Sequence, residues 1–136
     1  MTPKALVTDT HPLLNFFGKR PDKLSKKVRK AFEAALSGDM VIYVPIYVLI
    51  EISQLMKKSK IWLPKPLEEW ASDLFSSGHF VLTPLDAHIA FQYDRLAFTN
   101  DPADALIVAT AVCLGLPLMT NDGNIHATKP CQLYWD

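Results

Sequence analysis

The chain has 136 residues, of which 49% are hydrophobic and 21% are charged, and it contains no internal repeat or low-complexity tract. These values predict one compact domain covering residues 1–136, and they exclude a disordered or fibrous protein. The 14 basic and 14 acidic residues cancel, so the net charge by itself does not indicate a partner such as nucleic acid.

Short apolar segments alternate along the chain with longer segments of helical periodicity. The apolar segments predict strands at residues 4–9, 40–45, 79–83 and 116–120. The periodic segments have ordinary start and stop residues, and they predict helices at residues 10–17, 24–39, 46–60, 66–78, 85–98 and 102–114. A strand is the alternative for residues 46–60, because this segment is rich in aromatic and branched side chains. A last apolar segment covers residues 131–135.

This alternation of strands and helices predicts the fold class. Parallel strands need a crossover connection, which is usually a helix, so we expect an α/β fold, a three-layer sandwich with a central parallel sheet. Ligands of such sheets bind beyond the carboxyl ends of the strands, where the strand order reverses. Asp9 and Asp122 both follow a predicted strand, which makes them candidates for a site at this edge.

Several acidic residues are candidates for the site, and each has a simpler explanation. Asp9 is well suited to cap the helix that follows it. Asp101 precedes Pro102 and has the features of a helix cap, which explains Asp101 fully. The same cap explains Asp104 only in part, because the third helical residue of a capping box is normally Glu or Gln. Asp122 lies in "NDGN", which is typical of a tight hairpin turn, although a poor partner strand follows it.

Glu51 is the acidic residue that a purely structural explanation fits least well. It lies in "YVLIEISQLM", with no lysine or arginine within four residues. A buried carboxylate without a partner is costly, so burial would imply a partner from elsewhere in the chain or a bound cation. The alternative is that Glu51 lies at an exposed edge of its helix.

Taken together, these acidic residues predict a metal site. The fold would bring Asp9, Glu51, Asp104 and Asp122 to one edge, where only a bound cation makes their mutual repulsion tolerable. Ligands that are all oxygen favour Mg²⁺ or Mn²⁺ over zinc. Such a site suits hydrolysis of a phosphodiester, since the ion activates water and neutralises charge on the phosphate.

The same residues carry a resemblance to a known family. The chain resembles PIN-domain ribonucleases, and among them the VapC toxins of toxin–antitoxin pairs. The resemblance rests on "VTDTHPLL", "VLIEI", "DPADALIVATA" and "LMTND", which occur in the family's order and at about its spacing. These motifs span essentially the whole chain, and together they are moderately specific.

The resemblance implies a PIN-like fold and an acidic quartet that binds Mg²⁺ or Mn²⁺, formed by Asp9, Glu51, Asp104 and Asp122. It makes Thr120 a polar helper beside the last of these, and it makes Asp101 a secondary residue at a helix start. It also implies cleavage of RNA, a homodimer, and inhibition by a cognate antitoxin protein whose tail fills the active groove.

The chain departs from the family pattern at positions near the motifs. Relatives often have His-Arg before the "DP.D" motif and an arginine after it, whereas this chain has Thr99, Asn100 and Ala105. Leu55 stands where relatives commonly carry a lysine, one helical turn after Glu51. We therefore expect this protein to contact RNA differently.

A basic segment at residues 19–30 contains half of the lysines and arginines of the chain. One interpretation is a solvated helix face, and the other is a surface that binds the phosphates of RNA. The candidate RNA-binding residues are Lys19, Arg20, Lys23, Lys26, Lys27, Arg29 and Lys30.

Two other functions remain open from the sequence. A phosphatase would use Asp9 as a covalent nucleophile, but that chemistry typically uses a second aspartate two positions later, where this chain has His11. A domain that binds RNA or protein without catalysis would not need the four mutually repelling carboxylates. His11 itself either lies near the site or is a hydrogen-bonded structural group at a helix start.

Other features restrict the class of protein. The longest apolar run, residues 41–50, is about half as long as a membrane-spanning helix requires, so we expect no membrane association. The N-terminus lacks the pattern of a secretory signal, and Cys113 and Cys131 lack zinc-ligand spacing, so we expect a cytoplasmic protein with reduced cysteines. The His-Glu-x-x-His and Gly-x-Ser-x-Gly motifs of two other hydrolase classes are absent.

Overall fold

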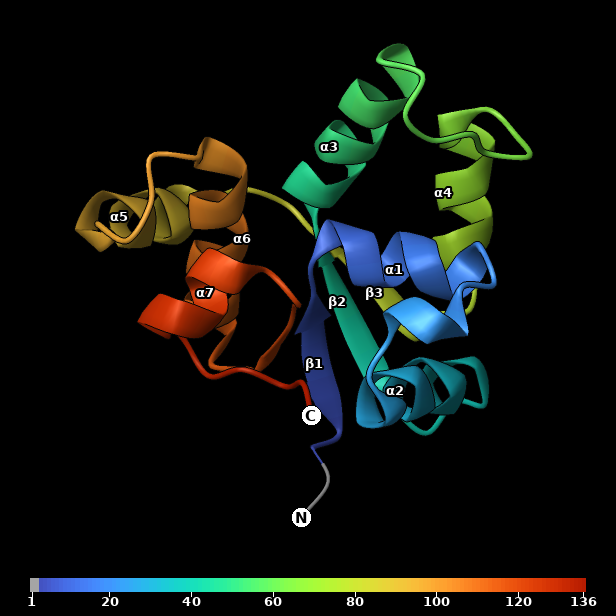
Figure 1. Cartoon of the computed structure of the whole chain (residues 1–136), viewed down its shortest axis with the longest axis horizontal. Coiled ribbons are helices and arrows are strands. Elements are labelled where there is room, and N and C mark those ends of the chain that lie inside the picture. The colour runs from blue at the N-terminus through green and yellow to red at the C-terminus, as the bar shows by residue number, and fades with distance from the viewer. Residues whose placement is uncertain (1–2) are drawn as a thin grey trace.

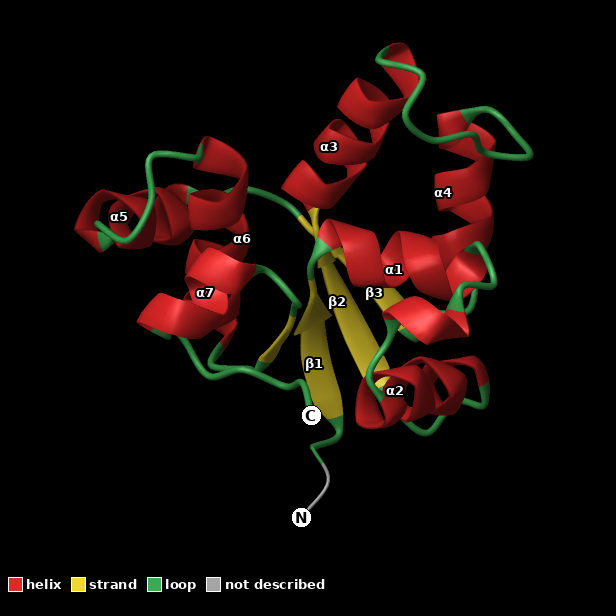
Figure 2. Ribbon diagram, viewed as in Figure 1, coloured by secondary structure: helices red, strands yellow, loops and turns green. Residues whose placement is uncertain are grey.

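The computed structural model describes residues 3–136 and contains a sheet of four parallel strands with helices on both sides (Figures 1 and 2). The strands are β1 (Ala5–Thr8), β2 (Val41–Pro45), β3 (Phe80–Thr83) and β4 (Leu118–Met119), and their order is β3-β2-β1-β4. The predicted α/β fold, a three-layer sandwich with a parallel sheet, is confirmed. Because β1 lies between β2 and β4, the strand order reverses at the end of β1.

The helices are α1 (Thr10–Phe17), α2 (Lys26–Leu36), α3 (Ile46–Lys57), α4 (Leu67–Phe75), α5 (Ala87–Arg95), α6 (Pro102–Leu114) and α7 (Gly123–Thr128), with a short 3₁₀ helix, η1 (Pro21–Lys23). Figure 1 shows α1, α2 and α4 on one side of the sheet and α5, α6 and α7 on the other. Helix α3 contacts both α1 and α6, so it connects the two helical layers at the carboxyl edge of the sheet.

The core consists of an aromatic cluster on one side of the sheet and a buried helix on the other. Phe32 of α2 is fully buried, and its ring stacks on those of Phe16 and Phe80, with centroid distances of 4.9 and 6.4 Å. Helix α6 has small and branched residues on nearly every face and is buried along most of its length, as expected for a helix that is apolar all round. This burial fixes the helix whose first turn carries Asp104.

The predicted elements agree with the structure in type and differ in length. The bounds of α6 agree with the prediction, and the helix over residues 46–60 is confirmed as α3, so the alternative of a strand there is wrong. Strand β4 is shorter than the predicted segment 116–120. Residues 131–135 form no regular strand but make one parallel bridge, between Leu118 and Leu133.

Two helices were not predicted. No sequence pattern indicates η1, and "NDGN" favours a hairpin turn where the structure has α7. The hairpin alternative is wrong because the Asp122 carboxylate accepts a hydrogen bond from the Ile125 backbone N–H at 2.9 Å and so caps a helix. Within residues 3–136, no helix combines the length and hydropathy needed to cross a membrane. Both cysteines are free thiols.

Candidate metal centre

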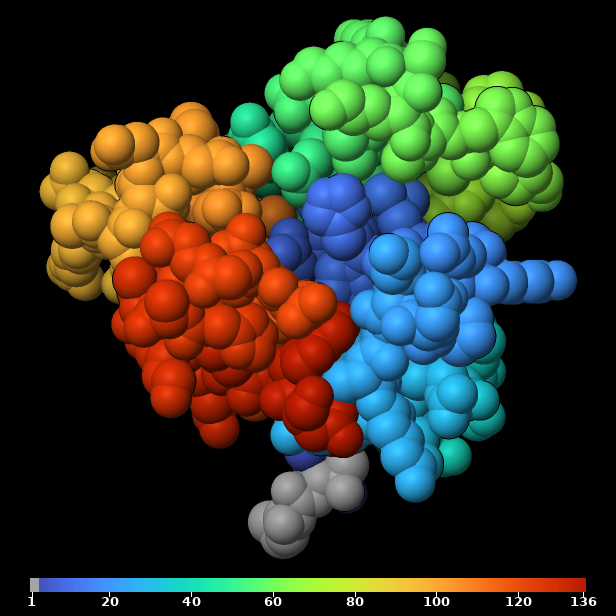
Figure 3. All heavy atoms as spheres, in the orientation of Figure 1, coloured from blue at the N-terminus to red at the C-terminus, as the bar shows by residue number. Residues whose placement is uncertain are grey.

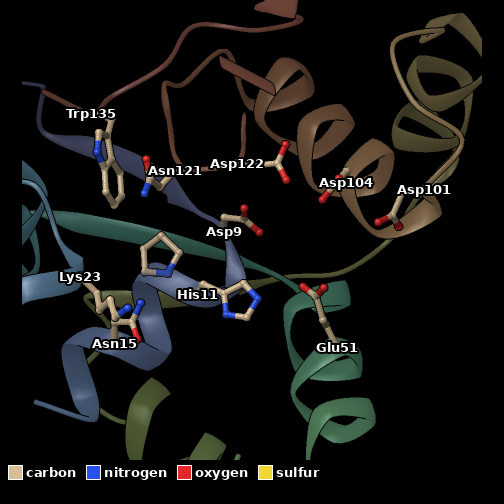
Figure 4. A pocket seen from close by; sticks show the side chains of 11 residues that line it. Asp9, His11, Asn15, Lys23, Glu51, Asp101, Asp104, Asn121, Asp122 and Trp135 are labelled. Carbon is tan, nitrogen blue, oxygen red and sulfur yellow. The ribbon is translucent and has the colours of Figure 1, made fainter. Parts of the chain in front are cut away.

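A pocket of about 430 Å³ lies at the carboxyl edge of the sheet, beside the end of β1. The acidic side chains that line it come from four separate parts of the chain and lie around the pocket in Figure 4. The acidic residues that line the pocket are Asp9, Glu51, Asp101, Asp104 and Asp122. The structure therefore brings together all the acidic residues that the sequence singled out.

Asp9 follows β1 directly and is 8% exposed. Its Oδ1 accepts a hydrogen bond from the Thr10 backbone N–H, and its Oδ2 accepts one from Thr120 Oγ1, both at 2.7 Å. Burial raises the pKa of Asp9, the hydrogen bonds from Thr120 and Thr10 oppose that rise, and the negative charge of Glu51 adds to it. The carboxylate thus caps α1 and also has a fixed orientation at the pocket.

Glu51 lies on α3, which follows β2 without a loop, and it is half-buried. Its Oε1 accepts a hydrogen bond from the hydroxyl of Thr10, a fully buried residue in the first turn of α1. The partner that the apolar surroundings of Glu51 implied is therefore a hydroxyl group from a distant segment. This hydrogen bond neutralises no charge, so the negative charge of Glu51 remains at the pocket.

Asp101 and Asp104 lie at the start of α6. Asp101 caps the helix, since its Oδ1 accepts a hydrogen bond from the Ala103 backbone N–H at 2.9 Å. Asp104 is half-buried, and its pKa rises from 3.8 to about 7. Burial is the largest cause, and the negative charges of Asp122, Asp101, Asp9 and Glu51 follow in that order. Asp104 is therefore the residue on which the charges of all the other carboxylates act.

Thr120 and Asp122 follow β4. The buried hydroxyl of Thr120 donates to Asp9 and accepts a hydrogen bond from the Asp122 backbone N–H at 3.1 Å. The Thr120 carbonyl oxygen lies 2.6 Å from His126 Nε2 of α7. These contacts tie the segment after β4 to the segment after β1, so Thr120 positions two of the carboxylates.

The chemistry of these side chains fits a hard divalent cation. All five carry oxygen donors, and none of them forms an ion pair with a lysine or arginine in the described part of the chain. As they stand, no three His, Cys, Asp or Glu side chains within residues 3–136 are grouped closely enough to hold an ion directly. The fit to a hard cation therefore rests on the donor type, since Mg²⁺ takes oxygen ligands and retains several waters.

The remaining lining residues of the pocket are not acidic, and the sequence did not indicate most of them. They are His11, Pro12, Asn15, Lys23, Asn121 and Trp135. His11 is exposed and its ring has no hydrogen bond to residues 3–136, so it is not a hydrogen-bonded structural group. His11 and Asn15 are four residues apart on one face of α1, a spacing that the sequence shows, whereas no local pattern indicates Trp135.

The structure does not gather the basic segment into one surface. Lys23 alone lines the pocket. Arg20 pairs with Asp22 at 3.2 Å, and Lys27 lies 4.3 Å from the centre of the Tyr134 ring. Lys19 and Arg29 line a separate depression, and Lys26 and Lys30 are exposed on α2.

Comparisons with known proteins agree with this fold. A family model described as PIN domain matches residues 6–129. No curated protein matches the chain in sequence. Among solved structures, one match is a chain of VapBC2 from Rickettsia felis, with a TM-score of 0.68. That structure is described as bound to a DNA fragment from the VapBC2 promoter. The two chains are 18% identical, and the match covers 97% of this chain and 99% of that one.

A second solved structure, a toxin–antitoxin complex from Klebsiella pneumoniae, contains a chain that matches with a TM-score of 0.64. The identity is again 18%, and the match covers 94% of this chain and 99% of that one. At such low identity the similarity to these two structures shows the fold alone, because one fold can carry many different functional sites.

Proposed function

This chain belongs to the PIN domain family, and from that membership we propose that it is a Mg²⁺- or Mn²⁺-dependent endoribonuclease that acts as the toxin of a toxin–antitoxin pair. One observation carries the proposal: the five carboxylates from four segments face one pocket and form no ion pair with a basic group of residues 3–136. A folded chain retains such repelling groups at a cost, and binding a divalent cation offsets that cost.

The proposed ligands are the quartet Asp9, Glu51, Asp104 and Asp122, in direct contact with the ion or through water. A bound ion would supply activation of a water and neutralisation of charge on the phosphate. The chain itself contributes orientation. Thr120 and the Thr10 backbone hold both oxygens of Asp9, and the Thr10 hydroxyl holds Glu51. Asp101, which caps α6, lies outside this quartet and stays a secondary residue of the proposal.

The test is cleavage of RNA by the purified protein. Mixed cellular RNA is incubated with the parent chain and with an Asp9→Asn, Asp104→Asn double variant, in Mg²⁺, in Mn²⁺ and in EDTA. The matched control is an Asp86→Asn, Asp94→Asn double variant, which removes the same charge from exposed positions on α5. We expect cleavage by the parent and the control, only with metal.

Equal cleavage by the parent and the Asp9→Asn, Asp104→Asn variant would end the proposal. RNA binding without cleavage would favour a binding domain instead. Hydrolysis of a phosphate monoester without cleavage of RNA would favour a phosphatase with Asp9 as the nucleophile.

The toxin part of the proposal is supported by the two solved structures of similar fold, one described as VapBC2 and the other as a toxin–antitoxin complex. We propose a cognate antitoxin whose tail fills the acidic groove, a homodimer, and action in the cytoplasm, where cellular RNA is located. Induced expression in a bacterial host tests the toxicity. The parent should arrest growth and the Asp9→Asn, Asp104→Asn variant should not, at equal amounts of folded protein.

A further inference from the structure

The pocket has two chemically different walls. Figure 4 shows the carboxylates gathered on one side, with Trp135, Asn121, Asn15 and Lys23 on the other and His11 between the two groups. No carboxylate lines this second wall. It combines an indole, two amides and one ammonium group, which are the groups that bind a base, its polar edge and a phosphate.

Trp135 is held in place by backbone hydrogen bonds of the C-terminal segment. The Leu118 N–H donates to the Gln132 carbonyl and the Tyr134 N–H donates to the Leu118 carbonyl, both at 2.9 Å. Asp136 accepts a hydrogen bond from the Lys27 backbone N–H at 3.3 Å. Figure 3 shows the C-terminal atoms, in red, against the light-blue atoms of the basic segment. The half-buried indole therefore projects from an ordered backbone.

Lys23 is the only lysine or arginine that lines the pocket. It lies at the end of η1, is exposed, and forms no ion pair within residues 3–136, whereas its neighbour Arg20 pairs with Asp22. The ammonium group and the carboxylates thus lie at opposite sides of one pocket without neutralising each other. An anionic group in this part of the pocket would meet Lys23 and none of the carboxylates directly.

From this arrangement we propose that Trp135, Asn121 and Lys23 form a subsite for one nucleotide of single-stranded RNA beside the scissile phosphate. Trp135 stacks on the base, Asn121 forms a hydrogen bond with the edge of the base, and Lys23 binds a backbone phosphate. The proposal rests on the proposed function, because it describes how the RNA substrate of that site is held. The pocket volume of about 430 Å³ is within the usual range for sites that bind small ligands.

RNA suits this wall better than an acidic peptide does. A peptide carboxylate could use Lys23 but would leave the indole and the amide without a function. A nucleotide uses all three groups, and stacking on an indole tolerates every base because each base has a π face. Any preference for one base at this subsite would therefore come from the hydrogen bond with Asn121 and not from stacking on Trp135.

The experiment measures binding of a labelled RNA hexanucleotide of random sequence to the full chain by fluorescence anisotropy in EDTA, where no metal chemistry occurs. The variants are Trp135→Ala and Lys23→Ala. Their matched controls are Trp62→Ala and Lys60→Ala, at exposed positions that do not line the pocket. Each pocket variant should bind about tenfold more weakly than the parent, and each control should bind within about twofold.

Binding within about twofold of the parent by either pocket variant would overturn the subsite. A loss of RNA binding in the controls as large as in the pocket variants would overturn it as well. So would displacement of the RNA by a glutamate hexapeptide that binds the chain with the same affinity as the RNA. Trp135 also packs against the core, so circular dichroism accompanies each measurement. If Trp135→Ala does not fold, Lys23→Ala and Asn121→Ala decide: losses in both support the subsite, and any other result overturns it.

A kinetic readout separates this proposal from the nuclease itself. With metal present, Lys23→Ala should raise KM and leave kcat nearly unchanged. Trp135→Phe keeps an aromatic ring for stacking, so it should raise KM less than Trp135→Ala does. RNA that binds through Trp135 and Lys23 but is never cleaved would leave the subsite standing and refute the nuclease. Cleavage by Lys23→Ala with the KM of the parent would refute the subsite alone.

Discussion

Replacing Asp104 with asparagine should stabilise the protein when no metal is bound. The pKa of this carboxyl rises from 3.8 to about 7 on folding, because of burial first and then the surrounding carboxylates. The folded state therefore favours the protonated form. Below the pKa of the unfolded chain both states are protonated and folding carries no penalty. The penalty grows as the pH rises between the two pKa values, and it is complete above about pH 7.

The magnitude follows from the same two pKa values. One pKa unit corresponds to about 1.4 kcal/mol, so a rise from 3.8 to about 7 corresponds to at most about 4 kcal/mol. Asp104 is only half-buried, and screening by solvent reduces this figure to about 2 kcal/mol. In EDTA at about pH 8, Asp104→Asn should therefore unfold with a free energy about 2 kcal/mol higher than that of the parent.

Urea unfolding followed by circular dichroism, at several pH values in EDTA, measures this difference. The advantage of Asp104→Asn should vanish near pH 4, and Mg²⁺ should reduce it at neutral pH by stabilising the parent. Asp86→Asn, on the exposed start of α5, controls for the change in net charge. The reasoning would be refuted if Asp104→Asn were more stable than the parent by the same amount near pH 4 and at about pH 8. It would also be refuted if Asp104→Asn were less stable than the parent in EDTA at about pH 8.

Substitutions at three further positions test a hydrogen bond of the site, a helix cap and the packing of the core. Thr120→Val removes the hydroxyl that donates to Asp9, so it should lower the free energy of unfolding in urea by about 1–3 kcal/mol. It should also raise the pKa of Asp9 further, as measured by NMR titration of the carboxyl group. An unchanged pKa of Asp9 would contradict the role of Thr120 as its hydrogen-bond donor. Asp101→Ala should lose about 1 kcal/mol of stability through the lost cap of α6, whereas Asp101→Asn should not. Because Asp101 lies outside the proposed metal ligands, both variants should cleave RNA at rates similar to that of the parent. A large loss of cleavage in both variants would instead make Asp101 a metal ligand. Phe32→Ala should lower the free energy of unfolding by about 3–5 kcal/mol, because it leaves a cavity between two aromatic rings. If the midpoint of urea unfolding stays that of the parent, this cluster does not stabilise the fold.

The positions of Asp9 and Asp122 at one edge could be predicted because each follows a strand, and parallel strands end at the same edge of a sheet. Asp104 could be predicted in the same way from the start of the buried α6. Glu51 was a candidate because apolar neighbours surround it in the sequence and because it lies in "VLIEI", one of the motifs that carry the family resemblance. Its partner could not be predicted, since the hydrogen bond from Thr10 joins residues 41 positions apart, and no local pattern encodes such a contact.

Other parts of the structure were not predictable for identifiable reasons. The sequence around Asp122 fits both a hairpin turn and a helix cap, because Asn, Asp and Gly favour both. Helix α7 has only six residues, too few to show a helical period. Trp135 reaches the pocket because the C-terminal segment lies beside β4, and a pairing between segments that are separate in sequence has no periodic signature.

The structure also shows that capping a helix and lining a metal site are compatible roles for the same carboxylate. One oxygen each of Asp9, Asp101 and Asp122 accepts a backbone N–H at the start of α1, α6 or α7. The partial positive charge at a helix start stabilises a nearby carboxylate by about 0.3–1 kcal/mol. Three helices that begin at one pocket therefore offset part of the repulsion among these acids. Asp104, in the first turn of α6, shares this stabilisation, whereas Glu51 lies in the interior of α3 and receives none of it. Glu51 therefore gives the strongest reason to expect a bound cation.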